Sequence, residues 1–127
     1  MLRSLENHAP APRICHDVRN YDKGVLVMAV LIEDVFPAAI TIDLLDAVTD
    51  DMGVDNNLPA GAVLHLHYEK DGRAHGVDVW DSIEAYEQFV ESTLMPAIGK
   101  IAAERGIDLS QAGEPEVKVT EIHRLVR

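Results

Sequence analysis

The segment Ala62–Tyr86, with the sequence AVLHLHYEKDGRAHGVDVWDSIEAY, decides how this chain folds. Its first seven residues, and the eight residues that follow the Asp-Gly pair, each alternate between two kinds of side chain, as β-strands do. Asp71-Gly72 between them is typical of a two-residue hairpin turn. Either Asp81 or Ser82 can then cap a helix, with Glu84 in its first turn. The segment therefore predicts a β-hairpin that leads directly into an amphipathic helix.

The flanking sequence supplies one element of each kind on either side. Residues 24–32 (GVLVMAVLI) form an apolar run without polar alternation, which predicts a central strand that ends before Glu33-Asp34. Apolar spacing predicts a helix from Thr41 to about Met52, stopped by Gly53. The helix after the hairpin should reach about residue 106, with a kink or restart at Pro96. A last strand is expected over about 116–126, with a bulge near position 121.

The order of the predicted elements is βαββαβ. Two interleaved right-handed β-α-β units of this kind give the ferredoxin-like α+β fold, a four-stranded antiparallel sheet with two helices on one face. The other face of the sheet then stays uncovered, and an apolar face of that size exceeds what a monomer usually exposes. We therefore expect a second copy of the chain to close it through a two-fold interface, forming a dimeric α+β barrel.

The 127 residues suffice for one domain, and their composition limits the partners of that domain. Hydrophobic residues make up 47% of the chain, which excludes wholesale disorder. The net charge of −11 argues against nucleic acid and against anionic membranes. Residues 1–23 hold three acidic and four basic side chains and predict an extended or disordered arm, so residues 24–127 form the acidic domain. A single cysteine and an N-terminus without an apolar stretch predict a cytoplasmic protein.

The strand-to-helix junction carries a family resemblance. VDVWDSIEAY at 77–86, followed by Phe89-Val90, resembles the dimeric α+β barrel superfamily typified by antibiotic-biosynthesis monooxygenase-like proteins. Small actinobacterial members look nearest, because they share a Pro-Ala-Gly strand start, here at 59–61, and histidines matching His65 and His123. The resemblance implies a homodimer whose sheets face each other, with a ligand pocket between sheet and helices or within the barrel.

The activities of that superfamily are diverse, and the fold alone does not choose among them. They include cofactor-free oxygenation of polyphenols, haem degradation, lactone isomerisation and dehydration. Haem-using relatives place a histidine ligand on the second helix, whereas residues 82–106 contain no histidine. We therefore expect no cofactor.

Polar and aromatic side chains of the hairpin form the candidate site. Leu64, Leu66, Val77 and Val79 are the natural helix-facing residues, which would place the alternate side chains on the face away from the helices. These alternate side chains are His65, His67, Asp78 and Trp80. A bulge near position 121 would add His123 to them. Two histidines, a carboxylate and an indole are then predicted to converge in the barrel.

A proton-transfer site is one interpretation of this group. Asp78 beside a histidine would fix its tautomer and raise its basicity, so His65, Asp78 and His123 are the predicted catalytic residues. His67 and Trp80 would bind a small organic ligand, with the indole as a flat wall. This reading predicts monooxygenase-like or isomerase-like chemistry without a cofactor.

Three alternatives stay open from the sequence. The same side chains can instead pair across a dimer interface, because buried polar groups need partners whatever the function. The protein can also be a non-catalytic binding or accessory subunit of a biosynthetic or regulatory assembly. The lesser alternative is a metal site at His65 and His67, which stand two apart on a strand and point the same way.

Overall fold

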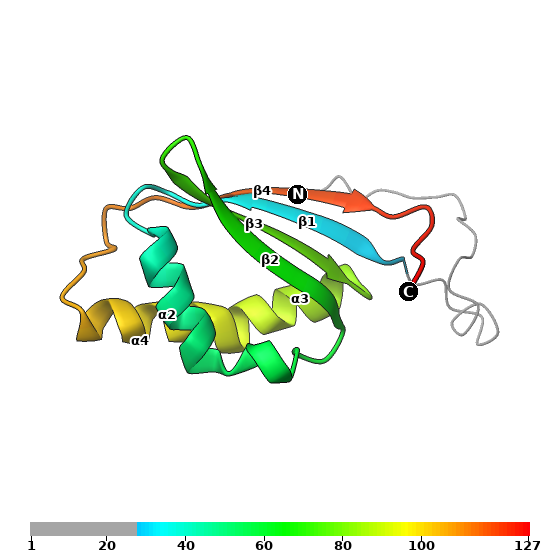
Figure 1. The fold of residues 1–127 in the computed structure, drawn as a ribbon, viewed down its shortest axis with the longest axis horizontal. Helices are drawn as coiled ribbons and strands as arrows, with labels where there is room; N and C mark the ends of the chain where they lie inside the picture. Colours follow the sequence, from blue (N-terminus) through cyan, green and yellow to red (C-terminus); the bar gives the residue numbers. More distant parts are fainter. Residues whose placement is uncertain (1–27) are drawn as a thin grey trace.

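Four antiparallel strands form one sheet, and the helices lie against one of its two faces (Figure 1). The computed structural model describes residues 28–127, so the predicted arm at 1–23 lies outside the described residues. The strand order β2-β3-β1-β4 and the βαββαβ succession confirm the predicted ferredoxin-like α+β fold. The strands are β1 (Val30–Val35), β2 (Ala62–Lys70), β3 (Arg73–Trp80) and β4 (Glu116–Glu121).

Strand β1 occupies the centre of the sheet, but it runs further than its apolar sequence predicts. It pairs with β3 on one side and β4 on the other as far as Val35, so Glu33-Asp34 does not end it. Pairing on both sides holds these two acidic residues in the extended conformation. Their side chains point to opposite faces, and the side that carries Val30 and Ile32 also carries the buried Asp34.

Helix α2 (Ile42–Met52) begins and ends where the sequence predicts. The hydroxyl oxygen of Thr41 accepts a hydrogen bond from the backbone N–H of Leu44 at 3.1 Å, which caps the helix. Gly53 follows in the left-handed conformation, with φ of 67°, and its N–H donates to the carbonyl of Asp50 at 3.1 Å. A short 3₁₀ turn, η1 (Val54–Asn56), then leads toward β2.

The second helical segment is divided into three parts. Helix α3 (Ile83–Phe89) begins at Ser82, whose hydroxyl accepts from the N–H of Ala85 at 3.1 Å. A π-helical turn, η2 (Val90–Leu94), separates it from α4 (Met95–Glu104). The predicted interruption at Pro96 therefore occurs, and it takes the form of a widened turn directly before the proline. Pro96 has no N–H to donate to the carbonyl four residues earlier, which makes a regular helix unfavourable there.

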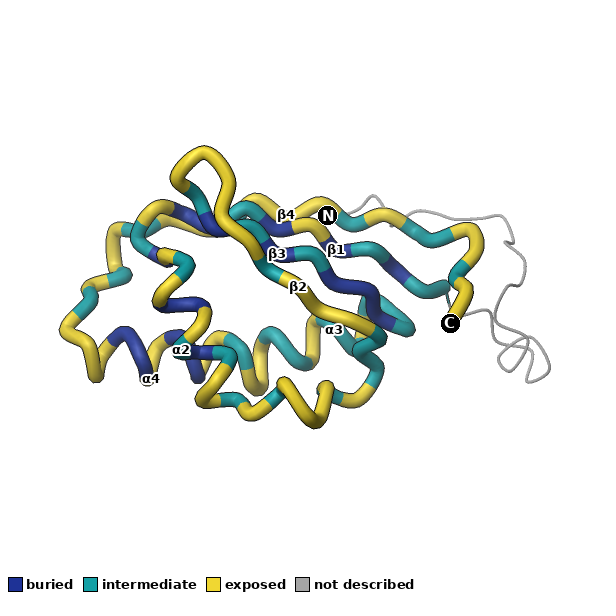
Figure 2. Tube along the Cα trace, in the orientation of Figure 1, coloured by how far each residue is buried: buried dark blue, intermediate teal, exposed yellow. Residues whose placement is uncertain are grey.

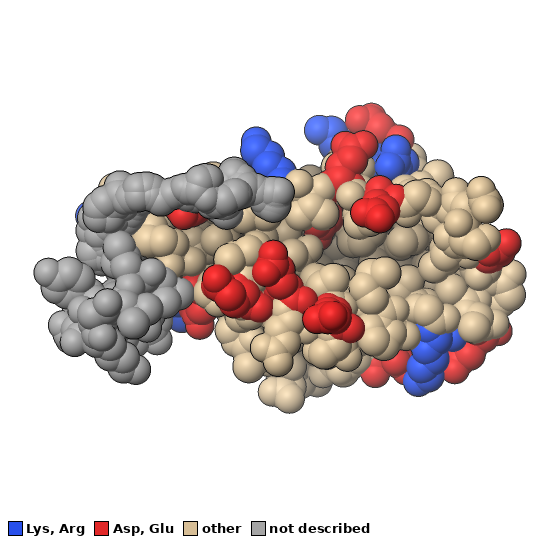
Figure 3. All heavy atoms as spheres, turned by 180° about the vertical axis from the view of Figure 1, so that it is seen from behind, with Lys and Arg blue, Asp and Glu red and all other residues tan. Residues whose placement is uncertain are grey.

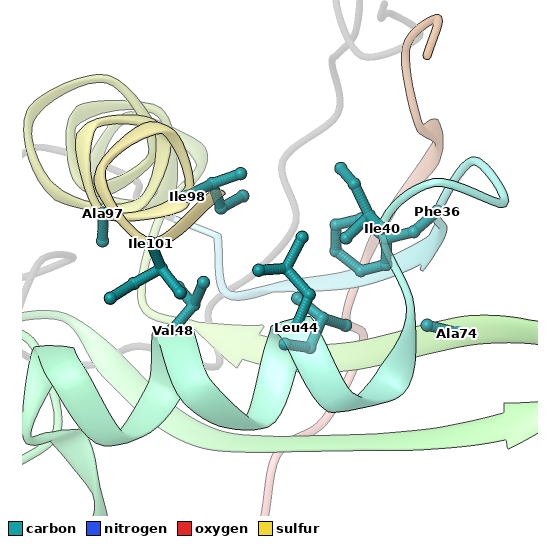
Figure 4. Packing of buried hydrophobic residues seen from close by; sticks show 9 residues of the cluster. Phe36, Ile40, Leu44, Val48, Ala74, Ala97, Ile98 and Ile101 are labelled. Atoms are coloured by element: carbon teal, nitrogen blue, oxygen red, sulfur yellow. The ribbon is translucent and has the colours of Figure 1, made fainter. Parts of the chain in front are cut away.

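Two clusters of buried apolar residues join the helices to the sheet. In the larger cluster, Leu44 and Val48 of α2 pack against Ile98 and Ile101 of α4 (Figure 4). Phe36 and Ile40 after β1 and Ala74 of β3 complete its base. The smaller cluster joins Val30, Ile32 and Trp80 of the sheet to Ile83, Ala85, Tyr86 and Phe89 of α3. Buried residues lie mainly in the central strands β1 and β3 and in α2 and α4, whereas the edge strands β2 and β4 are half-buried or exposed (Figure 2).

The bulge lies in a different strand from the predicted one. Over 116–121, β4 pairs with β1 in regular register, and no irregularity occurs at position 121. The register shifts instead in β2, where Ala62 is opposite Trp80 but Leu64 is opposite Val79. At this end Gly61, with φ of +90°, brings the chain so near α3 that an added Cβ would lie 2.7 Å from that of Ala85.

The surface reflects the acidic composition. On the side seen in Figure 3, several Asp and Glu side chains gather in the middle, and others lie beside the Lys and Arg side chains near the edges. No helix within residues 28–127 is long and apolar enough to cross a membrane.

Candidate functional site

The structure reverses the predicted faces of the hairpin. Asp78 and Trp80 are 7% and 2% exposed and lie on the side that the helices cover. The ring of Trp80 packs edge-on against Tyr86 of α3, with 5.8 Å between the centroids. The prediction that Asp78, Trp80, His65 and His67 point away from the helices is therefore wrong. The opposite face carries Leu64, Leu66 and Tyr68, which are 39%, 46% and 42% exposed.

The side chains of β3 explain this reversal. One side of the strand carries Ala74, Gly76, Asp78 and Trp80. Because Ala74 and Gly76 are small, the helices can approach that side closely. Trp80 fills the space under α3, which begins only three residues later. A face with one very large and two very small residues fits the helices, although its mean hydropathy is lower than that of the other face.

A cavity lies between this covered face and the helices. Apolar side chains form most of its wall, and its volume of about 50 Å³ is enough for a few water molecules. Trp80, Phe36 and Phe89 supply aromatic walls, and Asp34, Asp78, His65 and Tyr86 supply polar groups. Both carboxyl groups therefore belong to a largely apolar pocket, where charge is costly.

Asp78 holds two partners at once. One carboxylate oxygen accepts from the indole N–H of Trp80 at 3.1 Å, and the other is 2.5 Å from Nδ1 of His65. His65 is opposite Asp78 in the strand register, which explains their contact. The hydrogen bond to Asp78 raises the pKa of His65 above its ordinary value of 6.5, and burial opposes this rise. The predicted Asp–His pair therefore forms.

The hydrogen bonds continue from His65 toward the surface. Nε2 of His65 is 3.0 Å from Nδ1 of His67, and Nε2 of His67 is 2.7 Å from a carboxylate oxygen of Asp46 on α2. The side chain of His67 is 15% exposed, and that of Asp46 is 61% exposed. All four ring nitrogens of the two histidines thus have partners within the chain.

Asp34 contributes one unpaired oxygen atom to the cavity. Among the described residues, its Oδ1 is the one buried side-chain oxygen or nitrogen without a hydrogen-bond partner. Burial, followed by the charge of Asp78, raises the pKa of Asp34 from 3.8 to about 7, while His65 and the Tyr86 hydroxyl lower it. Asp34 can therefore gain or lose a proton near neutral pH.

Tyr86 and His75 lie on opposite faces of the sheet. Tyr86 packs on Trp80 and also lines the cavity. Burial, and then the charge of Asp34, raise the pKa of its hydroxyl above the ordinary value of 10.0. His75 stacks on Tyr68 of the uncovered face, with ring centroids 5.1 Å apart.

The structure does not bring His123 to this site. It follows the end of β4, is exposed, and is neither among the residues that line the cavity nor in the hydrogen-bond chain of His65. The bulge that would have turned it inward is absent from β4.

Sequence reasoning missed Asp34 and Asp46 because each looked like ordinary surface acid. Asp34 was taken as the end of a strand, yet it stands two residues after Ile32 and so shares its face. Asp46 lies on the exposed side of α2. Its contact with His67 joins segments 21 residues apart, and no local pattern signals such a contact.

The two strand histidines do not converge on a common point as metal ligands would. Their facing nitrogens bond to each other, and within residues 28–127 no group of three or more His, Cys, Asp or Glu side chains is arranged to hold a metal ion.

Several solved structures share this fold. SnoaB, a cofactor-independent oxygenase from Streptomyces nogalater, aligns with a TM-score of 0.51 and 13% identity, over 79% of this chain and 98% of that one. A candidate antibiotic biosynthesis monooxygenase from Caulobacter crescentus gives 0.54 and 13%, over 80% and 96% of the two chains. A protein of unknown function from Nitrosomonas europaea gives 0.54 and 14%, over 79% and 93%.

No protein-family model and no curated protein matches this chain. At 13–14% identity, the solved structures establish the fold and leave the activity open. The chain has the ferredoxin-like α+β fold that antibiotic-biosynthesis monooxygenase-like proteins use. The likeness to small actinobacterial members stays a prediction.

Proposed function

We propose that this protein is a cofactor-independent enzyme that binds a small aromatic molecule and moves a proton to or from it. Such a step belongs to both monooxygenase-like and isomerase-like reactions. Asp34 carries the proposal, because it is a buried carboxyl group in an apolar cavity with one oxygen unpaired and a pKa of about 7. A general acid or base is most effective when its pKa lies near the working pH.

The surrounding side chains have separate tasks in this proposal. Asp34 exchanges a proton with the substrate, because both ring nitrogens of His65 are already bonded. The charge of Asp78 disfavours the anionic form of Asp34, and a protonated His65 offsets part of this effect. Trp80 and Phe89 hold the ring of the substrate, and their aromatic faces exclude water from the proton transfer.

The space in the cavity sets a condition for this function. Ligand sites for molecules of drug size are several hundred cubic ångströms, and about 50 Å³ is open here. Binding of a ring therefore requires side chains to move aside. Leu58 and Met52 at the helix-to-strand connection line the cavity from its less buried side and are the side chains expected to give way.

Trp80 offers a direct test, because it is the only tryptophan of the chain. Titration with 1-naphthol should quench its fluorescence to a saturating limit. In D₂O, 1-naphthol should exchange its ring hydrogen ortho to the hydroxyl for deuterium faster with the wild type than with Asp34→Asn, followed by NMR. Asp50→Asn, which neutralises an exposed acid on α2, is the matched control and should exchange as fast as wild type.

The outcomes separate binding from catalysis. Saturable quenching with equal deuterium exchange in wild type and Asp34→Asn would remove Asp34 from the chemistry. No quenching by naphthol, with the fold intact by circular dichroism, would remove the cavity as an aromatic site.

We propose, as a second point, that the working unit is a cytoplasmic homodimer joined through the uncovered sheet face. The support is the set of exposed apolar side chains on that face, Leu64, Leu66 and Tyr68. Leu66→Glu should convert the dimer to a monomer in analytical ultracentrifugation. Met95→Glu changes an apolar residue on α4 that is 54% exposed, and this control should leave the dimer intact. A wild-type monomer would overturn this part.

One observation favours a second candidate function. The narrowness of the cavity around Trp80 is what a non-catalytic binding or accessory subunit would show, because its side chains can fill the space permanently. Naphthol distinguishes the two functions, since a filled cavity would give no saturable quenching.

A further inference from the structure

A continuous series of three hydrogen bonds connects the cavity with the surface of α2. It runs from Asp78 to His65, from His65 to His67, and from His67 to Asp46, with distances of 2.5, 3.0 and 2.7 Å. The exposed fraction of the side chain is 10% at Asp78 and 61% at Asp46. The series therefore leads from a buried carboxylate to a solvated one.

The number of protons in this series follows from its geometry. Each hydrogen bond needs one proton between its two atoms, so three bonds hold three protons. With both carboxylates ionised, the four ring nitrogens must then carry three protons, which is one positive charge shared by two imidazoles. If both histidines were neutral beside two ionised carboxylates, one of the three bonds would lack its proton.

The extra proton has four places at which all three bonds stay intact. It can reside on Asp78, on His65, on His67 or on Asp46, and each step moves one proton across one existing hydrogen bond. When it passes from Asp78 to Asp46, each ring accepts a proton on its inner nitrogen and releases one from its outer nitrogen. No ring has to leave its place during the passage, and no other reactant is consumed.

We propose that His65, His67 and Asp46 conduct protons between Asp78, whose carboxyl group lines the cavity, and the solvent. His67 and Asp46 act through His65 and are positioning residues that touch no substrate. The relay extends the proposed function, since a proton exchanged with a substrate must be returned to or taken from water. The side chain of His65 is 35% exposed, but both of its ring nitrogens are already bonded within the chain. The relay therefore gives His65 a route for proton exchange with water that direct contact does not provide.

Charged and titratable groups on the packed elements agree with this direction. Asp34 on β1 and Asp78 on β3 attract positive charge to the inner end of the pair, and both raise the pKa of His65. Asp46 on α2 attracts it to the outer end, and the Tyr86 hydroxyl on α3 faces Asp34. The shared proton thus has a carboxyl group at each end of its path.

Histidine ring signals can test the relay without any ligand. In ¹⁵N-histidine protein, NMR reports how many protons each ring nitrogen carries as the pH changes. Asp46→Asn should lower the pH at which the pair loses its shared proton, because an opposite charge in contact is removed. Asp46→Glu should restore it. Asp50→Asn, one turn further along α2, should shift it by less than about 0.3 units, since an exposed charge at that distance is screened.

Exchange with water tests conduction itself. His67→Gln keeps a side chain that can hydrogen-bond but cannot carry a proton onward, so the ring proton of His65 should exchange with water at least about tenfold more slowly. The fold of each variant is checked by its amide spectrum. An unchanged exchange rate in His67→Gln, or equal shifts in Asp46→Asn and Asp50→Asn, would overturn the relay.

These results are independent of the test of the proposed function. The relay can fail while naphthol still quenches Trp80, and it can stand while naphthol does not bind. Each failure therefore points to its own proposal.

Discussion

The two faces of the β2–β3 hairpin differ in a way that runs against average hydropathy. The face under the helices carries Asp78, His65 and Trp80, whereas the uncovered face carries Leu64 and Leu66. On the covered face Asp78, His65 and Trp80 are paired with one another, which removes most of the cost of burying Asp78 and Trp80. The difference teaches that coverage by helices follows side-chain size and pairing as well as hydropathy.

The largest expected effect on stability comes from removing the bulkiest side chain of the covered face. Trp80→Ala should lower the free energy of unfolding by about 3–5 kcal/mol, because it leaves a void under α3 and removes a donor to Asp78. Urea denaturation followed by circular dichroism measures the loss. A change below about 1 kcal/mol would mean that Trp80 is not the anchor between sheet and helix.

The buried acid of the covered face should make stability depend on pH. Asp34 keeps its proton up to a pH of about 7 when folded and up to 3.8 when unfolded, so the folded state binds more protons in this window. The free energy of unfolding therefore falls as the pH rises from 4 to 7. Asp34→Asn has no carboxyl group to ionise, so its free energy of unfolding should exceed that of the wild type by about 2–4 kcal/mol at pH 8.

Urea denaturation of both proteins at pH 4, 6 and 8 measures this. The two should have similar stability at pH 4, because this pH lies close to the unfolded pKa of 3.8 and little of the loss has yet occurred. A difference that stays constant over the three pH values would show that the carboxyl group does not titrate in this range.

A smaller effect is expected from loosening the Asp–His pair. Asp78→Asn should cost about 1–3 kcal/mol, because one bond becomes neutral and one buried partner is weakened. The pKa of His65 should fall, since the bond to Asp78 is the main cause of its rise. The wild-type pair stabilises the fold below pH 6.5, and this contribution disappears as the pH rises through the folded pKa. Proton NMR of the ring follows the change, and an unshifted His65 would contradict the assigned cause.

The uncovered face should respond least in the monomer. Leu66→Ser should change the free energy of unfolding by less than about 0.5 kcal/mol at a protein concentration low enough to dissociate dimers, because Leu66 is 46% exposed. Denaturation at low and high concentration is compared. A large loss at low concentration would mean that another part of the same chain covers this face.

Much of the fold was predictable because its signals are local. Thr41, Gly53 and Ser82 cap their helices as expected, and Asp71-Gly72 makes the hairpin turn. The turn also fixes the register that sets His65 opposite Asp78, so the pairing was predictable from the hairpin alone.

The orientation of the site was not predictable from alternation. Both faces of the hairpin alternate equally well, and the pattern separates them without saying which one the helices cover. The pairing of His67 with Asp46 and the burial of Asp34 depend on how α2 and β1 lie against the hairpin in space. Distances in the sequence contain no such information. The small residues Ala74 and Gly76 were the one available signal of close helix approach.

The bulge between Ala62 and Leu64 separates the start of β2 from the rest of the strand. From Leu64 to Lys70 the register follows from the turn at Asp71-Gly72, and this part carries the histidines. At the start of the strand, Gly61 lies close to Ala85 and Trp80. Because the bulge lets these two parts differ in register, substitutions can change the side chains displayed by the longer part while the start of the strand still lies against the helix, which gives the scaffold room to acquire new activities.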